Sequence, residues 1–338
     1  MYNQLFVFIL LSWISMTLAK AKLHVNENGD FKIVQFTDLH YGEDNCEDET
    51  YKCMQMVMKV AKPDFMAFTG DLIAGENWDH TQGWHEKLWR QWSNIANETQ
   101  TYYGITLGNH DPNGELTSKE IMELDQTNPW SLSEVGPEEC SGTSNYVIPV
   151  YDYKNNTKVI FNIWFLDSQY KSCAGIGGAA CIEIETIEWY YKKSKELEKQ
   201  YNRIIPGIAF FHIPTQEFMY AWDNNSPVGH KDQLASCPRL NTGIIAAMIK
   251  RGDIKAVYCG HEHKNDFIVN YESISLALGR KTGLASEGEV EDFKHGGRVL
   301  EISTKDQFSI NNYIVNIDGE IEKQIKKEGI LERQYICH

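Results

Sequence analysis

Apolar and polar positions follow two recurring patterns along this 338-residue chain. Short runs rich in β-branched and aromatic residues, bounded by Gly, Pro, Asn or Asp, predict buried strands. Longer stretches with apolar residues at helical spacing predict helices. The principal strands are predicted at 31–36, 65–69, 102–107, 206–211 and 254–259. The helices are predicted at 51–61, 78–97, 117–124, 184–201 and 241–251. Strands that alternate with helices place the chain in the α/β class.

The rest of the pattern predicts further strands and several loops. Residues 145–151 and 158–166 predict a hairpin around a turn at 154–156. Short alternating runs predict antiparallel strands at 267–269, 274–278, 298–303 and 308–317. Long loops are predicted at 125–144 and 213–238, and a charged tail with room for a short helix at 318–338. Because no repeat or linker interrupts the pattern, we expect one domain over residues 20–338.

Residues 5–19 form an apolar block that ends in small residues, within a signal peptide predicted over residues 1–19. Thr17 and Ala19 suit the two recognition positions of a signal peptidase, which would make Lys20 the first residue of the mature chain. Because the block is shorter than the ~20 residues of a membrane span, we expect a cleaved signal. The protein is then secreted or resides in the lumen of the secretory or endolysosomal pathway, and an uncleaved anchor is the alternative. No later stretch of the sequence is long and apolar enough to span a bilayer.

Composition adds two constraints. The formal net charge is −15, and no Lys/Arg run forms the basic stripe typical of nucleic-acid binders, so long nucleic acids are not expected partners. All eight cysteines follow the leader, and an even number in an exported chain indicates disulfides. We expect the bridges Cys46–Cys53 and Cys173–Cys181, which are closest in sequence, and a free thiol at Cys259 inside a predicted strand. Sequons for N-glycosylation, in polar and loop-like stretches, occur at Asn97, Asn155 and Asn224.

Each of the five principal strands ends in side chains that bind metals. These side chains are Asp38, His40, Asp71, Asn109, His212, His261 and His263. In an open α/β sheet, ligands bind outside the carboxyl ends of the strands. Each motif by itself is more often a turn or a core residue, but the ordered set of five favours a metal site. Seven ligands are too many for one tetrahedral ion, so we expect two ions that share Asp71.

Together these residues resemble the calcineurin-like metallophosphoesterase superfamily. Its blocks are Asp-x-His, Gly-Asp, Gly-Asn-His-Asp, a lone His and Gly-His-x-His, which match here at 38–40, 70–71, 108–111, 212 and 260–263. The resemblance extends over about residues 31–317 and is closest to the purple-acid-phosphatase-related branch of plants and fungi. It implies a four-layer α/β/β/α sandwich with mixed central sheets and the metals at its central edge.

The resemblance also implies a role for each residue. One ion, which would be Zn, Fe or Mn, would be bound by Asp38, His40, Asp71 and His263. The other would be bound by Asp71, Asn109, His212 and His261. His110 would protonate the leaving oxygen or stabilise the transferring phosphoryl group, and Asp111 would orient His110.

Three features depart from the pattern of the relatives. Ala74 stands where purple enzymes carry a tyrosine ligand, so no tyrosinate–iron colour is expected. Gln233 stands where relatives often have Glu, and the acidic stretch 286–292 replaces a Gly-rich loop. Arg280 is expected either to bind phosphate or to form a surface salt bridge, since Arg suits both roles.

These expectations converge on a secreted phosphoester hydrolase that uses a hydroxide held between two metal ions. The first interpretation is a phosphomonoesterase that acts on a phosphorylated small molecule or a phosphoprotein. A phosphodiesterase or nucleotidase would share the chemistry, and the loops at 125–144, 171–181 and 213–238 would choose the substrate. A catalytically silent, secreted binding protein is the alternative from another class. The sequence does not predict the oligomeric state.

Overall fold

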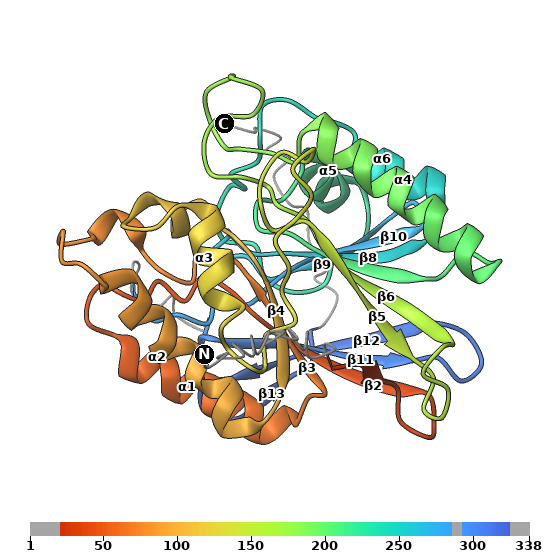
Figure 1. Ribbon diagram of the computed structural model, residues 1–338, viewed down its shortest axis with the longest axis horizontal. Coiled ribbons are helices and arrows are strands. Elements are labelled where there is room, and N and C mark those ends of the chain that lie inside the picture. Colours follow the sequence, from red (N-terminus) through yellow and green to blue (C-terminus); the bar gives the residue numbers. More distant parts are fainter. Residues whose placement is uncertain (1–20, 286–292, 325–338) are drawn as a thin grey trace, which may run out of the picture.

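Two β-sheets packed face to face form the centre of the computed structural model, which describes residues 21–285 and 293–324 (Figure 1). The six-stranded sheet has the order β13 (Ile321–Glu322), β12 (Ser309–Asn316), β11 (Gly296–Ser303), β2 (Asp30–Phe36), β3 (Phe65–Thr69), β4 (Tyr102–Thr106). The seven-stranded sheet has the order β1 (Leu23–His24), β5 (Tyr146–Tyr151), β6 (Val159–Phe165), β7 (Gly207–Phe210), β8 (Ile254–Cys259), β10 (Ile274–Leu278), β9 (Ile268–Tyr271). Strands β2, β3 and β4 run parallel, as do β6, β7 and β8.

Helices cover the outer face of each sheet (Figure 1). The helices beside the six-stranded sheet are α1 (Glu47–Ala61), α2 (Trp84–Thr99) and α3 (Ser118–Asp125). Those beside the seven-stranded sheet are α4 (Ile184–Tyr201), α5 (Gln216–Asn224) and α6 (Ile244–Arg251). Helix α1 packs on β2, β11 and β12, and α6 packs on β8. The predicted four-layer α/β/β/α sandwich with mixed sheets is therefore confirmed.

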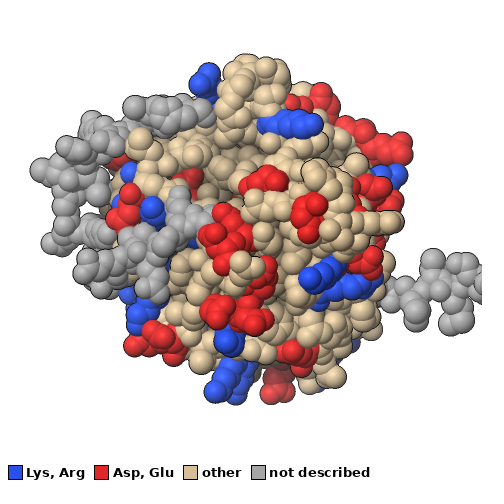
Figure 2. All heavy atoms as spheres, turned by 90° about the vertical axis from the view of Figure 1, so that its left-hand side faces the viewer, with Lys and Arg blue, Asp and Glu red and all other residues tan. Residues whose placement is uncertain are grey.

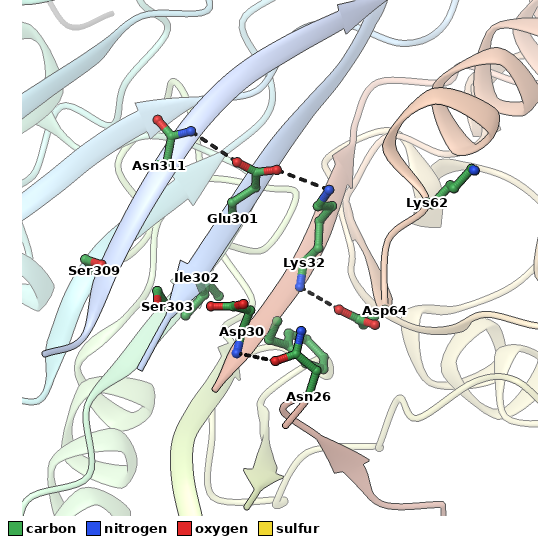
Figure 3. A pocket seen from close by; sticks show the side chains of 11 residues that line it. Asn26, Asp30, Lys32, Lys62, Asp64, Glu301, Ile302, Ser303, Ser309 and Asn311 are labelled. Carbon is green, nitrogen blue, oxygen red and sulfur yellow. Dashed lines mark hydrogen bonds and ion pairs between the residues drawn. The ribbon is translucent and has the colours of Figure 1, made fainter. Parts of the chain in front are cut away.

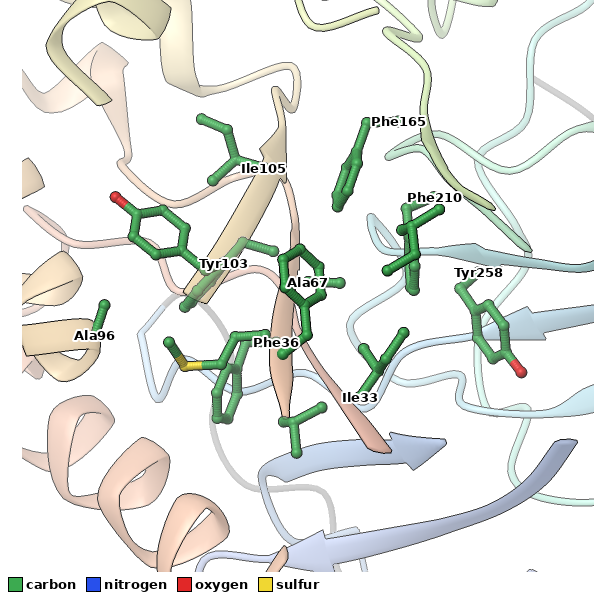
Figure 4. Close-up of a cluster of buried hydrophobic side chains, with 14 of the residues drawn as sticks. Ile33, Phe36, Ala67, Ala96, Tyr103, Ile105, Phe165, Phe210 and Tyr258 are labelled. Atoms are coloured by element: carbon green, nitrogen blue, oxygen red, sulfur yellow. The ribbon is translucent and has the colours of Figure 1, made fainter. Parts of the chain in front are cut away.

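Aromatic side chains fill the space between the layers. Phe165, Phe210 and Tyr258, on the neighbouring strands β6, β7 and β8, stack in series with 5.4 Å between the ring centroids of each adjacent pair. Figure 4 shows this stack opposite Ile33 and Ala67 of the six-stranded sheet. All five side chains are buried. Because the interiors of proteins are close-packed, this core holds the two sheets, and the strand ends they carry, in one fixed relation.

Three helices differ from their predicted bounds by more than one residue, and a fourth helix was not predicted. Helix α2 begins at Trp84 rather than at residue 78 and ends at Thr99 rather than at residue 97, and α6 begins at Ile244 rather than at residue 241. Helix α1 begins at Glu47 rather than at residue 51, and its first turn holds the acidic residues that the sequence pattern assigned to a loop. Negative charge near a helix N-terminus is stabilising, which explains the earlier start. Helix α5 lies inside the predicted loop 213–238. Its buried residues Phe218, Ala221 and Trp222 follow helical spacing, a signal that the surrounding Pro and Asn residues had obscured.

The cysteine prediction is half right. Cys173 and Cys181 form a disulfide with Cα atoms 5.1 Å apart. The predicted Cys46–Cys53 bridge is wrong, because both residues are free thiols. Cys53 points into the core from α1, whereas Cys46 precedes that helix and is half-buried. Cys259 is a buried free thiol, as expected.

The three sequons all present an exposed Asn. Asn155 lies in the β5–β6 turn, as predicted, but Asn97 and Asn224 lie in the last turns of α2 and α5 rather than in loops. The predicted signal peptide and the acidic stretch 286–292 lie outside the described residues. Of the helices that the structure describes, none has the length and apolar character needed to cross a membrane.

Surface charge follows the composition. Figure 2 shows Asp and Glu side chains gathered near the middle of the face on which α2 and α3 lie, with Lys and Arg set around them.

A separate polar hollow of about 600 Å³ lies at the amino ends of β2 and β3 (Figure 3). Its lining includes Asp30, Lys32, Lys62, Asp64 and Glu301. None of the predicted metal ligands lines this hollow.

Candidate metal centre

The structure brings the predicted ligands together at the carboxyl ends of the parallel strands of both sheets. The candidate ligands form two groups of side chains. Within each group, the ligand atoms lie within 4.8 Å of one another. One group is Asp38, His40 and His263, and the other is Asp71, His212 and His261. This division is the one that the family resemblance implied for two ions. The role of these residues as ligands remains a prediction.

His212 lies at the centre of the second group. Its Nε2 atom is 2.9 Å from Oδ2 of Asp71, 3.1 Å from Oδ1 of Asn109 and 3.2 Å from Nδ1 of His261. On the other side of the ring, Nδ1 lies 2.7 Å from the carbonyl oxygen of Thr69. That contact places the ring hydrogen on Nδ1, so Nε2 of the neutral ring presents a lone pair to the cluster.

This arrangement requires positive charge in the middle of the cluster. With the hydrogen on Nδ1 of His212, four electron-rich atoms from His212, Asp71, Asn109 and His261 face one another. The structure also leaves Nε2 of His40 and Oδ2 of Asp71 buried without a hydrogen-bond partner among the described residues. Buried polar atoms are almost always paired, and such exceptions indicate a missing ion or water. Imidazole nitrogen with carboxylate and amide oxygen is a donor set that fits Zn, Fe or Mn.

The first group faces the same point. His263 Nε2 is 3.6 Å from Oδ1 of Asp38, and His40 Nε2 is 3.9 Å from Oδ2 of Asp71. The outward nitrogen of His40, Nδ1, lies 3.2 Å from a carboxylate oxygen of Glu43. A carboxylate behind a histidine is the usual arrangement at metal sites, because it fixes the orientation of the ring and raises its basicity. Asp71 lies between the groups, so the structure supports its predicted shared position.

The backbone of the site adopts a conformation that non-glycine residues avoid. Four of the candidate ligands have positive φ angles: Asp38 at 53°, His40 at 50°, Asp71 at 52° and His261 at 72°. Left-handed backbone at such residues costs on the order of 1–3 kcal/mol each and collects at functional sites. The surrounding contacts hold these turns, which aims consecutive strand ends at one point.

Two glycines allow this close packing. A Cβ atom at Gly108 would lie 2.2 Å from Oδ1 of Asp71, and one at Gly70 would lie 2.7 Å from Nδ1 of His212. Both distances are shorter than any van der Waals contact. Gly70 also has a φ of 89°, which favours glycine. The Gly-Asp and Gly-Asn-His-Asp motifs therefore need their glycines because the ligand side chains occupy that space.

Neighbouring charges move the pKa values of the cluster in opposite directions. Burial alone would lower the pKa of His212, but the adjacent Asp71 carboxylate raises it to about 9. Burial and the charge on His212 lower the pKa of His261 to about 3. Burial alone would raise the pKa of Asp71, yet His212 and the other histidines hold it well below its usual range. Without a metal ion, His212 thus takes up a second proton and becomes positively charged. A bound metal cation would supply the same positive charge instead.

His110 sits at the edge of the cluster with its side chain 32% exposed. Its Nε2 is 3.9 Å from Oδ2 of Asp71, and its Nδ1 is in close contact with the carboxylate of Glu76. Glu76 belongs to the short 3-10 helix η1 (Gly75–Asn77), which follows the Gly-Asp motif. Burial alone would lower the pKa of His110, but Glu76 and Asp71 raise it to about 9. His110 is therefore positively charged near neutral pH, and sequence reasoning missed its partner Glu76.

The predicted role of Asp111 in orienting His110 is wrong. The Asp111 carboxylate is fully buried and instead accepts four backbone hydrogen bonds. The donors are the amides of Asp71, Leu72, Ile73 and Gly108, at 2.7–3.0 Å. Asp111 therefore holds the turn that carries Asp71 against the turn that carries Asn109. The side chain of Asp111 therefore contacts the backbone of the Asp71 turn and not His110, its neighbour in the sequence.

The other departures noted in the sequence also have definite positions. Arg280 is fully buried. Its guanidinium forms ion pairs with Asp266 at 2.6 Å and Glu322 at 2.9 Å, so it does not face solvent and is not free to bind phosphate. A salt bridge, one of the two alternatives predicted for Arg280, is therefore present, but it is buried rather than at the surface. Ala74 is buried beside the site. Gln233 donates a hydrogen bond to the carboxylate of Glu262, which lies between two of the candidate ligands.

Comparison with known proteins agrees with this geometry. The family model described as calcineurin-like phosphoesterase matches residues 31–265. The chain belongs to this family. Two relatives in Arabidopsis thaliana are named probable inactive purple acid phosphatase 29 and 14. The first is 31% identical and covers 82% of this chain and 78% of its own length, and the second is 28% identical and covers 80% and 75%. Phosphatase DCR2 of Saccharomyces cerevisiae is 26% identical over 75% of this chain and 47% of its own length.

Solved structures of the calcineurin-like phosphoesterase type share the fold. A dimetal phosphatase from Danio rerio aligns with a TM-score of 0.57 at 10% identity, over 88% of this chain and 98% of its own. The purple acid phosphatase PPD1 from yellow lupin seeds aligns with a TM-score of 0.53 at 13% identity, over 89% of this chain and 54% of its own. At such low identities the likeness concerns the fold and not the substrate.

Proposed function

We propose that this protein is a metal-dependent phosphoester hydrolase, and that its first substrate class is phosphate monoesters. The observation that carries the proposal is the pair of His/Asp groups, in each of which the ligand atoms lie within 4.8 Å of one another, with Asp71 close to both. Two cations bound there would supply a nucleophile near neutral pH and neutralise charge on the phosphoryl oxygens. Their identity is expected to be Zn, Fe or Mn, without the tyrosinate colour, because Ala74 offers no ligand atom.

Residues around the metal centre would protonate the leaving group and hold the ligands in position. His110 is oriented by Glu76 through Nδ1, which leaves Nε2 directed toward the cluster. A histidine protonated in this way is suited to give its proton to the leaving oxygen. Asp111 holds the two ligand turns together, and Thr69 fixes the ring of His212. Each role follows from a contact of the described residues.

A catalytically silent binding protein is the second candidate, because two relatives carry the word inactive in their names. The intact ligand set favours the hydrolase, since all seven predicted ligands and His110 are present and close together. The secreted location, the phosphorylated small-molecule or phosphoprotein substrate and the absence of long nucleic-acid partners remain part of the proposal.

Hydrolysis of p-nitrophenyl phosphate tests the proposed activity. We expect measurable turnover that a chelator abolishes and added Zn²⁺ or Mn²⁺ restores. His110→Ala should lower kcat by about a hundredfold or more, the usual contribution of a general acid, while the bound metal stays unchanged. His80→Ala, which alters an exposed histidine outside the cluster, is the matched control. Activity that survives both the chelator and His110→Ala would contradict the proposal.

Parallel kinetics on bis-p-nitrophenyl phosphate address the alternative diesterase or nucleotidase. We expect a larger kcat/KM for the monoester. A clear preference for the diester would move the assignment to the alternative while leaving the metal centre in place. Metal-loaded protein that turns over neither substrate would favour the silent binding protein.

A further inference from the structure

Glu262 is a buried carboxylate that the proposed chemistry does not use. It lies between the candidate ligands His261 and His263, on the turn that follows β8, and it is 1% exposed. A charged side chain in such a position is costly unless its oxygens are paired. Its pairing therefore shows what holds this turn in place.

Both carboxylate oxygens of Glu262 accept hydrogen bonds from protein donors. Oε1 accepts from the backbone amide of Ser236 at 2.7 Å. Oε2 accepts from the side-chain amides of Gln233 at 2.9 Å and Asn265 at 2.8 Å. Two of these three donors belong to residues 228–236, which we call the flanking segment. Every partner is a donor, so the site fits a carboxylate and not an amide.

Asn265 extends the same connection. Its Oδ1 accepts the backbone amides of Asp232 at 2.9 Å and Gln233 at 3.1 Å, and its Nδ2 also donates to the carbonyl of Gln233 at 3.2 Å. Backbone bridges pair Val228 with Ile268 and Lys231 with Asn265. The flanking segment is therefore bonded along its length to the stretch that carries His261 and His263.

The ligand turn needs such support. His261 has a φ of 72°, a conformation that costs a non-glycine residue free energy and persists only where its surroundings impose it. On one side of the turn, the amide of His261 donates to the Asp38 carboxylate at 3.1 Å. On the other side, Glu262 ties the turn to the flanking segment.

We propose that Glu262 is a positioning residue, which fixes the metal-binding geometry of His261 and His263 by bonding their turn to Gln233 and Ser236 of the flanking segment. This inference rests on the proposed metal centre. Groups behind metal ligands typically change metal affinity by ten- to hundredfold when they are replaced. Loss of the carboxylate would also leave buried donors unpaired, which loosens the flanking segment.

Zn²⁺ titration of metal-free protein tests the inference without any use of activity. Glu262→Gln should bind Zn²⁺ about ten- to hundredfold more weakly than the wild type. Limited proteolysis should cleave the flanking segment faster in the metal-free variant than in the metal-free wild type. Glu272→Gln, the same change on the exposed turn between β9 and β10, should leave both readouts unchanged. A folded Glu262→Gln protein with the Zn²⁺ affinity of the wild type would overturn the inference.

Gln233→Ala separates positioning from charge. This variant keeps the Glu262 carboxylate but removes one of its donors at a half-buried position that should tolerate the change. Positioning predicts weaker Zn²⁺ binding, by a few-fold, together with faster cleavage. If the charge of Glu262 alone mattered, Gln233→Ala would bind Zn²⁺ normally, and that result would overturn the inference even if Glu262→Gln does not fold. Zn²⁺-loaded wild-type protein without hydrolytic activity would contradict the proposed function and not this inference.

Discussion

At the amino end of β2, Lys32 forms an ion pair with Glu301 at 3.1 Å, and the two side chains are 31% and 42% exposed. At the carboxyl end of the same strand, Asp38 and His40 are 0% and 2% exposed. Figure 3 shows that Lys32 and Glu301 have partners within the hollow, and a carboxylate oxygen of Asp64 accepts a hydrogen bond from the backbone amide of Lys32. At the second end, Nε2 of His40 lacks a hydrogen bond among the described residues.

The two ends of β2 differ in burial and in hydrogen bonding, and this difference indicates which end of the sheet binds ligands. Exposed charges are solvated and contribute little, whether or not they meet a partner. Buried polar atoms without partners are costly, and several of them gathered in one cluster indicate a bound ligand. The hollow in Figure 3 is spacious, and two of its charged side chains, Lys32 and Glu301, are already paired with each other. The candidate metal centre is crowded, and its donor atoms suit a cation.

Glu76→Gln gives the largest expected effect of the variants that probe this comparison. The amide cannot hold the positive charge of His110 as a carboxylate does, so the orientation and the pKa of His110 should both change. We expect kcat to fall by roughly ten- to a hundredfold, with the metal content unchanged. Steady-state kinetics with elemental analysis checks this. Glu86→Gln on α2, an exposed residue paired with Arg90, is the control, and equal kinetics for the two variants would remove Glu76 from the mechanism.

His85 sharpens the comparison, because it is a buried histidine without a cluster around it. Both of its ring nitrogens lack hydrogen-bond partners among the described residues, and its ring stacks on Trp89. Burial lowers the pKa of His85 to about 4. The unfolded chain binds this proton near pH 6.5 and the folded protein does not, so the contribution to stability is full above pH 6.5 and is lost as the pH falls toward 4.

His85→Phe should therefore remove one source of acid sensitivity. Relative to the wild type, the variant should gain free energy of unfolding as the pH falls from 6.5 to 4, by up to about 3 kcal/mol. Zn²⁺ binding at neutral pH should not change. Urea unfolding of both proteins at pH 7.5 and at pH 4.5 measures the gain. An equal stability difference at the two pH values would show that His85 is not held neutral by burial.

Lys32→Met gives the smallest expected effect. The pair with Glu301 is partly exposed at both ends, so its loss should cost less than about 1 kcal/mol of stability. Hydrolysis and Zn²⁺ binding should stay at wild-type values. Thermal unfolding and the same phosphatase assay check the prediction. A large loss of activity would mean that the hollow at the amino end of β2 takes part in function after all.

The sequence predicted the parts of this molecule that depend on local pattern. The strands end where their apolar runs end, and the residues just beyond them lie within reach of one another because parallel strands share one edge. Within the helix predicted at 78–97, the apolar residue Trp92 packs on Phe68 with 4.7 Å between ring centroids. Cys173 and Cys181 form the expected bridge.

Contacts between distant segments were beyond such reasoning. Nothing in the spacing of Glu76 separates it from other acidic loop residues, and only the turn after Asp71 brings it to His110. Asp111 was misjudged for the same reason, since its partners are backbone amides of another loop. Arg280 looked like a surface residue until the buried carboxylate of Asp266 appeared beside it. Side-chain identity predicts which chemistry is possible, while the fold decides the partner.

The metal content of the protein tests the central claim most directly. Purified protein should be stripped with a chelator, loaded with excess Zn²⁺, passed through a desalting column and analysed for zinc per chain. The geometry around Asp71 predicts two ions in the wild type and a clear loss in Asp71→Asn, whose amide cannot provide the shared negative charge. A wild-type protein that retains fewer than one ion per chain, or an Asp71→Asn protein that retains two, would contradict the account.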